Sequence, residues 1–315
     1  MTVRIIQSIV GNTRNLEIKY NEDNPPIVFF DTNVWRSIND TDIAMLQRLQ
    51  QKYGFRYQYS VTNFVELASH LEDQPSKSCE KPFQMFQSCF RRIRKLCDRD
   101  ILPSPEMVFL AHAGLSRYID ASWIPDVRQM ALAVELVTNA NSLAELTGGE
   151  DGNIKTANAP RYVVKPSHYR KLRNIDGDSM RAIMEELQGF KRPILVDDSL
   201  VRWFIKLSHF FLFVRPTNGR MFLQDLTSEE QDRFSMALTE GVGRLFQTHC
   251  MILVKRTVND GRRVDPNDLY DMLQLILLEN GNSLFITSDK TFFLYEIDHD
   301  QPKRVLRWTD FISAA

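Results

Sequence analysis

The sequence is short of three things: long apolar runs, net charge and cysteine. Its 315 residues carry 39 basic and 40 acidic side chains, a formal net charge of −1, so a nucleic-acid ligand would need a local basic patch. The most apolar stretch, Phe204–Val214, is interrupted by Lys206 and His209 and falls short of the roughly 18 residues of a membrane span. Because the N-terminus lacks a signal-peptide layout, we expect a cytoplasmic protein with no membrane partner.

The four cysteines argue against a zinc site, because none belongs to a Cys-x-x-Cys pair and no histidine stands at zinc-finger spacing from them. Reduced, partly buried thiols are expected instead. The chain has no glycine-rich phosphate loop of the Walker or dinucleotide-binding type and no internal repeat. With 43% hydrophobic residues, it is long enough for one large domain or two small ones.

Apolar runs near both ends of the chain predict an α/β fold. Ile27–Phe30 and Leu284–Thr287 are continuous apolar runs, typical of strands buried on both faces. Tyr57–Val61 is expected to be the next strand and Val305–Trp308 an edge strand, while Thr41–Tyr53 has helical spacing. Because strands and helices alternate at both ends, we expect a central parallel sheet that the chain completes on its return.

The middle of the chain is predicted to be a large, mostly helical insertion or cap. Its stretch Asn141–Arg161, rich in Gly, Asn and Ala, is expected to be an exposed loop, and Met251–Val254 after it is a candidate strand. The predicted organisation is a strand pair in residues 1–25, a core made of 26–78 and 251–315, and an insertion over 79–250. The helices expected in the insertion are Lys81–Cys97, Pro105–Leu115, Pro125–Ala140, Asp178–Phe190, Asp197–Phe213 and Ser228–His249.

Acidic residues at the ends of the apolar runs are the most informative feature. Asp31 directly follows the first run, and Asp289 closes the last one. Glu66 and Asp271 lie on expected helices, after the second strand and before the last buried one. A carboxylate straight after a buried strand lies where open α/β sheets bind their ligands. Gathered there, carboxylates repel one another unless a cation joins them, so the pattern predicts a metal-dependent phosphodiesterase site.

Four short motifs in order resemble the PIN-domain ribonucleases. They are the strand followed by Asp31-Thr32-Asn33, Glu66 in Ser-Val-Thr-Asn-Phe-Val-Glu-Leu, Asp271 on the helix before the fourth strand, and Thr-Ser-Asp-Lys-Thr-Phe around Asp289. The spacing from Asp271 to Asp289 fits one helix, one short turn and one strand. The resemblance covers roughly residues 26–78 and 251–310, so most of the middle lies outside it.

The resemblance implies a PIN-like three-layer α/β/α fold and an endoribonuclease that uses Mg²⁺ or Mn²⁺. It implies Asp31 and Asp289 as direct metal ligands, with Glu66 and Asp271 holding a second ion or water ligands. Asn33 and Thr287 would orient the carboxylates or the scissile phosphate. Bound metal helps to deprotonate a water molecule and stabilises charge on the phosphate during attack.

Several alternatives stay open. Asp268 lies three residues before Asp271 on the same expected helix face and is either the family acid or a residue stabilised by the helix dipole. Asp31 and Asp289 are each at a position where a plain helix N-cap is also found. A structure-specific DNA nuclease and a non-catalytic RNA- or protein-binding scaffold are the other functional readings. An antitoxin-like protein regulator is a further partner to consider. Haloacid-type phosphatases need a second Asp where Asn33 stands.

Basic residues in the middle of the chain are candidates for RNA binding. Two tyrosines, Tyr162 and Tyr169, are interleaved with them, and aromatic stacking combined with phosphate contacts suits single-stranded RNA. A solvated helix face is the alternative for this cluster and is favoured for the run Arg91–Lys95. The candidate substrate-binding residues are Arg161, Lys165, Arg170, Lys171 and Arg173.

Overall fold

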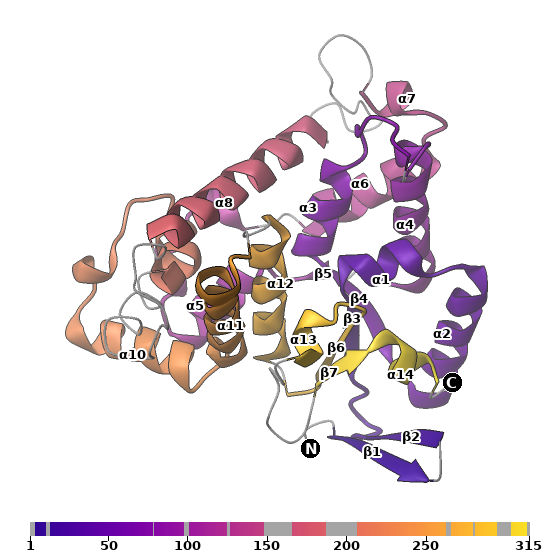
Figure 1. The fold of residues 1–315 in the computed structure, drawn as a ribbon, viewed down its shortest axis with the longest axis horizontal. Helices are drawn as coiled ribbons and strands as arrows, with labels where there is room; N and C mark the ends of the chain where they lie inside the picture. Colours follow the sequence, from indigo (N-terminus) through magenta and orange to yellow (C-terminus); the bar gives the residue numbers. More distant parts are fainter. Residues whose placement is uncertain are drawn as a thin grey trace.

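The protein is built around a five-stranded parallel sheet with helices on both faces, which confirms the α/β class and the central parallel sheet (Figure 1). The computed structural model describes residues 4–10, 13–77, 79–97, 101–124, 127–147, 166–186, 207–262, 266–279, 281–294 and 304–313. The strands lie in the order β5 (Ile101–Leu102), β4 (Arg56–Ser60), β3 (Ile27–Phe30), β6 (Ser283–Thr287) and β7 (Val305–Arg307).

The central strand β3 shows why the sheet needs helices on both sides. Val28 and Phe30 point to one face and Phe29 to the other, and all three are fully buried. Phe29 stacks on Phe285 of β6 with ring centroids 5.1 Å apart. A short strand that is apolar at every position therefore matches a parallel sheet covered on both faces.

One face of the sheet packs against α2 (Asp40–Tyr53), α4 (Pro82–Leu96) and α14 (Trp308–Ile312), with α6 (Val127–Asn139) outside α4. The other face packs against α11 (Arg244–Asp260), α12 (Pro266–Ile276) and α13 (Thr291–Leu294). A further apolar core joins α11 and α12 to α5 (Pro105–His112), α10 (Ser228–Thr239) and a π-helical turn, Phe210–Val214. The long helix α8 (Pro166–Glu186) runs along both α3 (Val61–Ser69) and α12 (Figure 1).

The chain order creates a switch point between β3 and β6. From β3 the chain moves outward to β4 and β5, and it then returns to the other side of β3 to form β6 and β7. Connections therefore leave β3 and β6 in opposite directions, which opens a crevice at their carboxyl ends. Open α/β sheets bind ligands in such a crevice, so this topology alone selects the ends of β3 and β6 as the place to look.

The N-terminal strand pair is also confirmed, as an antiparallel hairpin of β1 (Arg4–Val10) and β2 (Thr13–Lys19), although its turn lies outside the described residues. Several expected helices match closely, with α2, α4, α5 and α6 all within a few residues of their predicted limits. In the described part of the chain, no helix combines the length and apolar character needed to cross a membrane.

Three expectations for the middle of the chain were wrong. Met251–Val254 is not a strand but part of α11, because a short apolar run cannot be told from a buried helix segment by its pattern alone. The single helix expected over Ser228–His249 is two helices, α10 and α11. The break falls at Gly243, where a side chain would lie 3.0 Å from the Phe109 ring and from the Leu238 backbone. The expected loop after Asn141 contains a short helix, α7 (Leu143–Thr147).

The middle of the chain also supplies a strand that was not predicted. β5, only two residues long, pairs in parallel with the end of β4 through Tyr59 opposite Ile101 and Ser60 opposite Leu102. The segment 79–250 is therefore not purely helical, and part of it extends the sheet. Its division from the core as an insertion stays a prediction.

Candidate acidic active site

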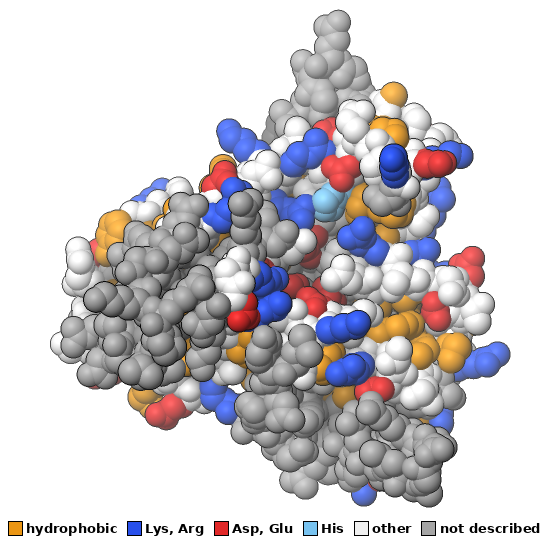
Figure 2. Space-filling model, in the orientation of Figure 1, with side chains coloured by type: hydrophobic (Ala, Val, Ile, Leu, Met, Phe, Trp, Pro, Cys, Tyr) orange, Lys and Arg blue, Asp and Glu red, His pale blue; other side chains and the backbone are white. Residues whose placement is uncertain are grey.

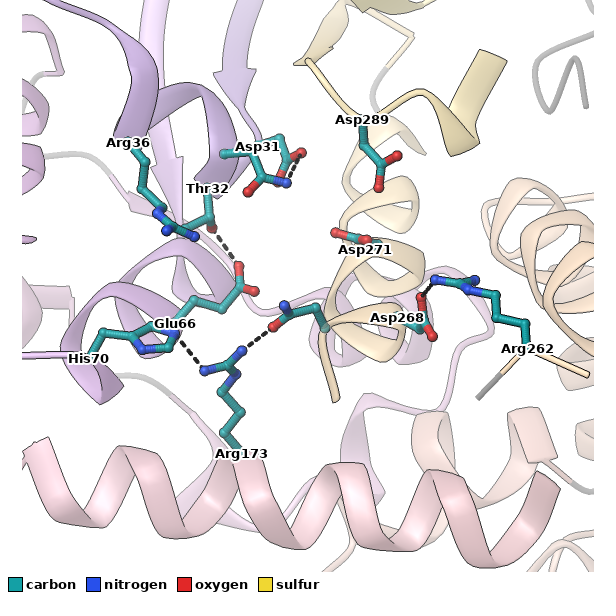
Figure 3. A pocket seen from close by; sticks show the side chains of 12 residues that line it. Asp31, Thr32, Arg36, Glu66, His70, Arg173, Arg262, Asp268, Asp271 and Asp289 are labelled. Carbon is teal, nitrogen blue, oxygen red and sulfur yellow. Dashed lines mark hydrogen bonds and ion pairs between the residues drawn. The ribbon is translucent and has the colours of Figure 1, made fainter. Parts of the chain in front are cut away.

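A polar pocket of about 220 Å³ lies at the carboxyl ends of β3 and β6 (Figure 3). All four acids singled out by the sequence, Asp31, Glu66, Asp271 and Asp289, line it, as does the alternative Asp268. They come from four separate parts of the fold: the end of β3, α3, α12 and the loop after β6. The remaining lining residues are Thr32, Asn33, Arg36, His70, Arg173, Arg262 and Asn267.

Asp31 is held by side chains rather than used as a helix cap. Its carboxylate accepts a hydrogen bond from the Thr287 hydroxyl at 2.7 Å and a longer one from the Asn33 amide at 3.4 Å. Although Asp31 stands at the N-cap position of α1 (Thr32–Ser37), its side chain makes no capping hydrogen bond. The structure therefore does not support the N-cap alternative for Asp31, whose carboxylate lies in the pocket.

Asp289 shares the same threonine. Its backbone N–H donates to the Thr287 hydroxyl at 2.9 Å, and its own Oδ1 accepts from the backbone N–H of Thr291 at 2.7 Å. One carboxylate oxygen of Asp289 therefore caps the start of α13, which agrees with the helix N-cap alternative considered for this residue. Asp289 nevertheless lines the pocket across from Asp271 (Figure 3).

Glu66 is placed by the abrupt start of its helix. Ser60 ends β4 and also caps α3, in a reciprocal capping box with Asn63, so strand and helix join without a loop. Glu66 is 6% exposed and accepts a hydrogen bond from the Thr32 hydroxyl. Burial is the main reason that its pKa rises to about 7 from an ordinary value of 4.5.

Asp271 and Asp268 enter from the first turns of α12 and have different surroundings. Burial raises the pKa of Asp271 well above its ordinary range, and the negative charges of Asp31, Glu66, Asp289 and Asp268 raise it further. Asp268 instead pairs with Arg262, with 2.7 Å between its Oδ1 and the arginine Nη2. Asp271 is therefore the acid that the other carboxylates crowd, whereas Asp268 already has a cationic partner.

A network of Arg173, His70 and Asn267 joins the two helices that carry the acids. Arg173, on α8, donates at 2.6 Å to Nε2 of His70, the residue that caps the end of α3, and to the side chain of Asn267 of α12. Because Nε2 accepts, His70 carries its proton on Nδ1, which donates to Asp73 at 2.6 Å. Burial lowers the pKa of His70 and favours this neutral ring.

The donor set fits a hard divalent cation. In the described part of the chain, none of Asp31, Glu66, Asp271 and Asp289 forms an ion pair with an arginine or lysine. Burial raises the pKa of Asp31, as it does those of Glu66 and Asp271, so without a cation these carboxyl groups tend to keep their protons, and a bound cation would favour the ionised forms. Among the described residues, no three His, Cys, Asp or Glu side chains form a ready-made coordination shell. Mg²⁺, which usually takes one or two carboxylates and keeps several waters, places the least demand on such a pocket.

The predicted basic residues are only partly brought to the site. Arg173 lines the pocket, whereas Arg170 next to it is paired with Asp73 and the Ser69 carbonyl. Lys171 is exposed on the outer side of α8 and does not line the pocket. Arg161 and Lys165 lie outside the described residues. On the molecular surface, blue basic side chains surround the hollow that holds the red acids (Figure 2).

Several residues of the site were not singled out from the sequence. Asn63 is fully buried and donates to the Thr32 hydroxyl at 3.0 Å and to Gln274 at 3.4 Å. It therefore connects α3 to α1 and to α12, which also carry residues of the pocket. Spacing offered a signal for two others, because His70 lies four residues after Glu66 and Asn267 four before Asp271, each on the same helix face. Arg36 and Arg262 have no such signal.

Comparison of the chain with protein-family models, with curated proteins and with solved structures found no match. The function therefore has to be argued from the fold and from the pocket.

Proposed function

We propose that the protein is a divalent-metal-dependent nuclease with a PIN-like site, acting as an endoribonuclease. The observation that carries this proposal is the meeting of four carboxylates, from four parts of the fold, in one pocket at the switch point of a parallel sheet. Asp31, Glu66 and Asp271 are buried, and Asp289 is partly buried. Burying acids without cationic partners destabilises a fold, and binding of a divalent cation would offset that cost.

Each acid has a role that follows from its surroundings. Asp31 and Asp289, both linked to the Thr287 hydroxyl, would hold the first metal ion, Mg²⁺ or Mn²⁺. Glu66 on α3 and Asp271 on α12 would hold a second ion or its water ligands. When bound, such a metal lowers the pKa of a water molecule and stabilises charge on the phosphate. Thr32, Asn33 and Thr287 keep the carboxylates turned into the pocket through their hydrogen bonds.

The preference for RNA over DNA rests on the resemblance of the four motifs to PIN-domain ribonucleases. The pocket supports a phosphodiester substrate in either case, since basic side chains surround the acids (Figure 2). A DNA nuclease with the same site remains the second candidate, and the panel described next separates the two.

The test is cleavage of single-stranded RNA and DNA by the wild type and by Asp31→Asn, with Mn²⁺, Mg²⁺ or EDTA. We expect metal-dependent cleavage of RNA that the variant loses while its circular dichroism spectrum is unchanged. Asp178→Asn, an exposed acid on α8 that pairs with Arg181, is the matched control and should cleave normally. Calorimetric titration with Mn²⁺ should show binding to the wild type and to the control. Equal cleavage by Asp31→Asn and wild type, or no cleavage by the wild type with either metal ion, would refute the proposal.

A further inference from the structure

Three arginines line the acidic pocket, and their partners differ. Arg36 is exposed, with its guanidinium 5.6 Å from the centre of the Phe86 ring. Arg173 uses both terminal nitrogens to hold α3 and α12 together. Arg262 uses one, Nη2, to contact Asp268, while its Nη1 is buried and has no hydrogen-bond acceptor among the described residues. Of the three, Arg262 therefore combines a fixed contact with a carboxylate and a terminal nitrogen that no described residue contacts.

The backbone at the end of α11 determines where the Arg262 side chain enters the pocket. Helix α11 ends at Gly261, whose φ of 67° lies in the left-handed region that glycine adopts without strain. The backbone N–H of Arg262 then donates to the carbonyl oxygen of Arg256 at 3.3 Å, which fixes where the side chain leaves the helix end. With Asp268 fixing the guanidinium itself, the side chain is oriented before any ligand arrives.

A phosphodiester needs such a group in this pocket. The wall of carboxylates repels a phosphate, and the metal ions neutralise only the oxygens that they contact. A guanidinium presents paired N–H donors that match the oxygens of a phosphate, and it stays charged at any working pH. In Figure 3 Arg262 reaches in from the α11 side, next to Asp268 and Asp271.

We propose that Arg262 binds a phosphate oxygen of the nucleic-acid strand held at the site, and that Asp268 positions Arg262 instead of ligating a metal ion. This inference rests on the proposed function, because it takes a phosphodiester strand as the ligand. It also assigns the two neighbouring acids of α12 to different tasks, Asp271 to metal and Asp268 to the arginine.

The experiment measures binding of a fluorescent 2′-O-methyl single-stranded RNA, which is not cleaved, in Mn²⁺ over a series of salt concentrations. We expect Arg262→Gln to weaken binding about tenfold and to reduce the slope of log affinity against log salt by about 0.7, the value for one lost phosphate contact on a single strand. Arg262→Lys keeps the charge but not the paired donors, so its affinity for the oligonucleotide should lie between those of the wild type and Arg262→Gln. Arg181→Gln, on the exposed side of α8, is the matched control and should bind like the wild type.

Mn²⁺ titration of the acid variants tests the second half of the inference. Asp268→Asn should keep Mn²⁺ affinity within about twofold of the wild type while weakening the oligonucleotide complex, whereas Asp271→Asn should lose Mn²⁺ affinity by about 10- to 100-fold. Loss of Mn²⁺ affinity in Asp268→Asn equal to that in Asp271→Asn would make Asp268 a metal ligand and overturn its positioning role.

The remaining outcomes separate this inference from the proposed function. An unchanged affinity and salt slope in Arg262→Gln, beside a wild type that cleaves RNA, would overturn the arginine contact alone. A reduced slope beside a wild type that cleaves nothing would support the contact and refute the nuclease activity. A wild type that neither binds the oligonucleotide nor cleaves RNA would overturn both.

Discussion

The Thr287 hydroxyl donates a 2.7 Å hydrogen bond to the Asp31 carboxylate, although Thr287 follows Asp31 by 256 positions in the chain. The same hydroxyl accepts from the backbone N–H of Asp289 at 2.9 Å. One threonine at the end of β6 therefore fixes the acid at the end of β3 and the acid that follows β6. It links the two strands that border the switch point of the sheet.

Replacing this threonine should disable the site without unfolding it. Thr287→Val keeps the β-branched shape that suits β6 but removes the hydroxyl, so Asp31 loses its shortest hydrogen bond. We expect Mn²⁺ affinity or the rate of RNA cleavage to fall by about 10- to 100-fold. Thr287→Ser retains the hydroxyl and should stay close to the wild type. Equal losses in the serine and valine variants would show that packing, and not the hydrogen bond, matters at this position.

The buried carboxylate of Glu66 should make metal-free protein less stable as the pH rises. Its pKa in the folded state is about 7 against an ordinary 4.5, so the folded state binds more protons than the unfolded state between these values. The stability due to Glu66 is therefore present at low pH and lost between pH 4.5 and 7, at a cost of roughly 3 kcal/mol. In EDTA at pH 7.5, Glu66→Gln should unfold at a higher urea concentration than the wild type, and the difference should shrink toward pH 4.5.

The quantity to follow with pH is the difference in stability between the wild type and Glu66→Gln, because buried histidines have the opposite effect on the stability of each protein. Burial lowers the pKa of His209 and of His249 to about 4, so each destabilises the fold as the pH falls from 6.5 toward 4. Both proteins contain these histidines, and their contributions cancel. A difference that does not change with pH would contradict a raised pKa for Glu66. Added Mn²⁺ should stabilise the wild type more than the variant at pH 7.5.

Asn63 should be far more important to stability than an ordinary helix cap. Asn63→Ala removes a capping box and also leaves Gln274 Oε1 without its donor, so we expect a loss of roughly 2–4 kcal/mol in the free energy of unfolding. Asn39→Ala is the matched control, since Asn39 forms a similar capping box at the exposed start of α2 and should cost only about 1 kcal/mol. Urea denaturation of both variants measures the two values, and equal losses would show that the buried contacts of Asn63 contribute nothing.

Tyr270 and Asp271 are neighbours on α12 whose substitution should have separable effects. The Tyr270 hydroxyl donates to the buried Asp176 at 2.8 Å, and Arg215 also contacts Asp176 at 3.1 Å; Tyr270 and Asp176 do not line the pocket. Tyr270→Phe should lower the free energy of unfolding by about 1–3 kcal/mol while leaving Mn²⁺ affinity unchanged. A loss of Mn²⁺ affinity in this variant would show that the Asp176 contact controls where Asp271 lies.

The strands and the acids could be predicted because their signals are local. Four apolar residues followed by Asp31 indicate both a buried strand and the position of its end, and the same holds for β6 and Asp289. Once those strands are neighbours in a parallel sheet, their carboxyl ends coincide. The resemblance of the motifs then added Glu66 and Asp271, whose distances along the chain give no hint that they share a pocket.

Other features could not be predicted because their causes lie far away in the sequence. β5 has only two residues, too few to show any period, and it is a strand because the end of β4 offers unpaired backbone groups. Asn63 and Arg262 look like ordinary polar residues until Gln274 and Asp268 are placed beside them. The division of Ser228–His249 into two helices depends on how closely Gly243 approaches Phe109, which only the packed structure reveals.

The distance along the chain between Asp31 and Thr287 also determines when the residues of the site become available during synthesis. A ribosome adds about 5–20 residues each second, so the 256 residues between these two side chains take roughly 13–50 s to make. Until the end of that interval, β3 has been made but its neighbour β6 is incomplete, and Asp289 does not yet exist. A polypeptide that has not been translated past residue 289 therefore lacks a complete acidic pocket, so the proposed nuclease could not cut the message that encodes it during that time.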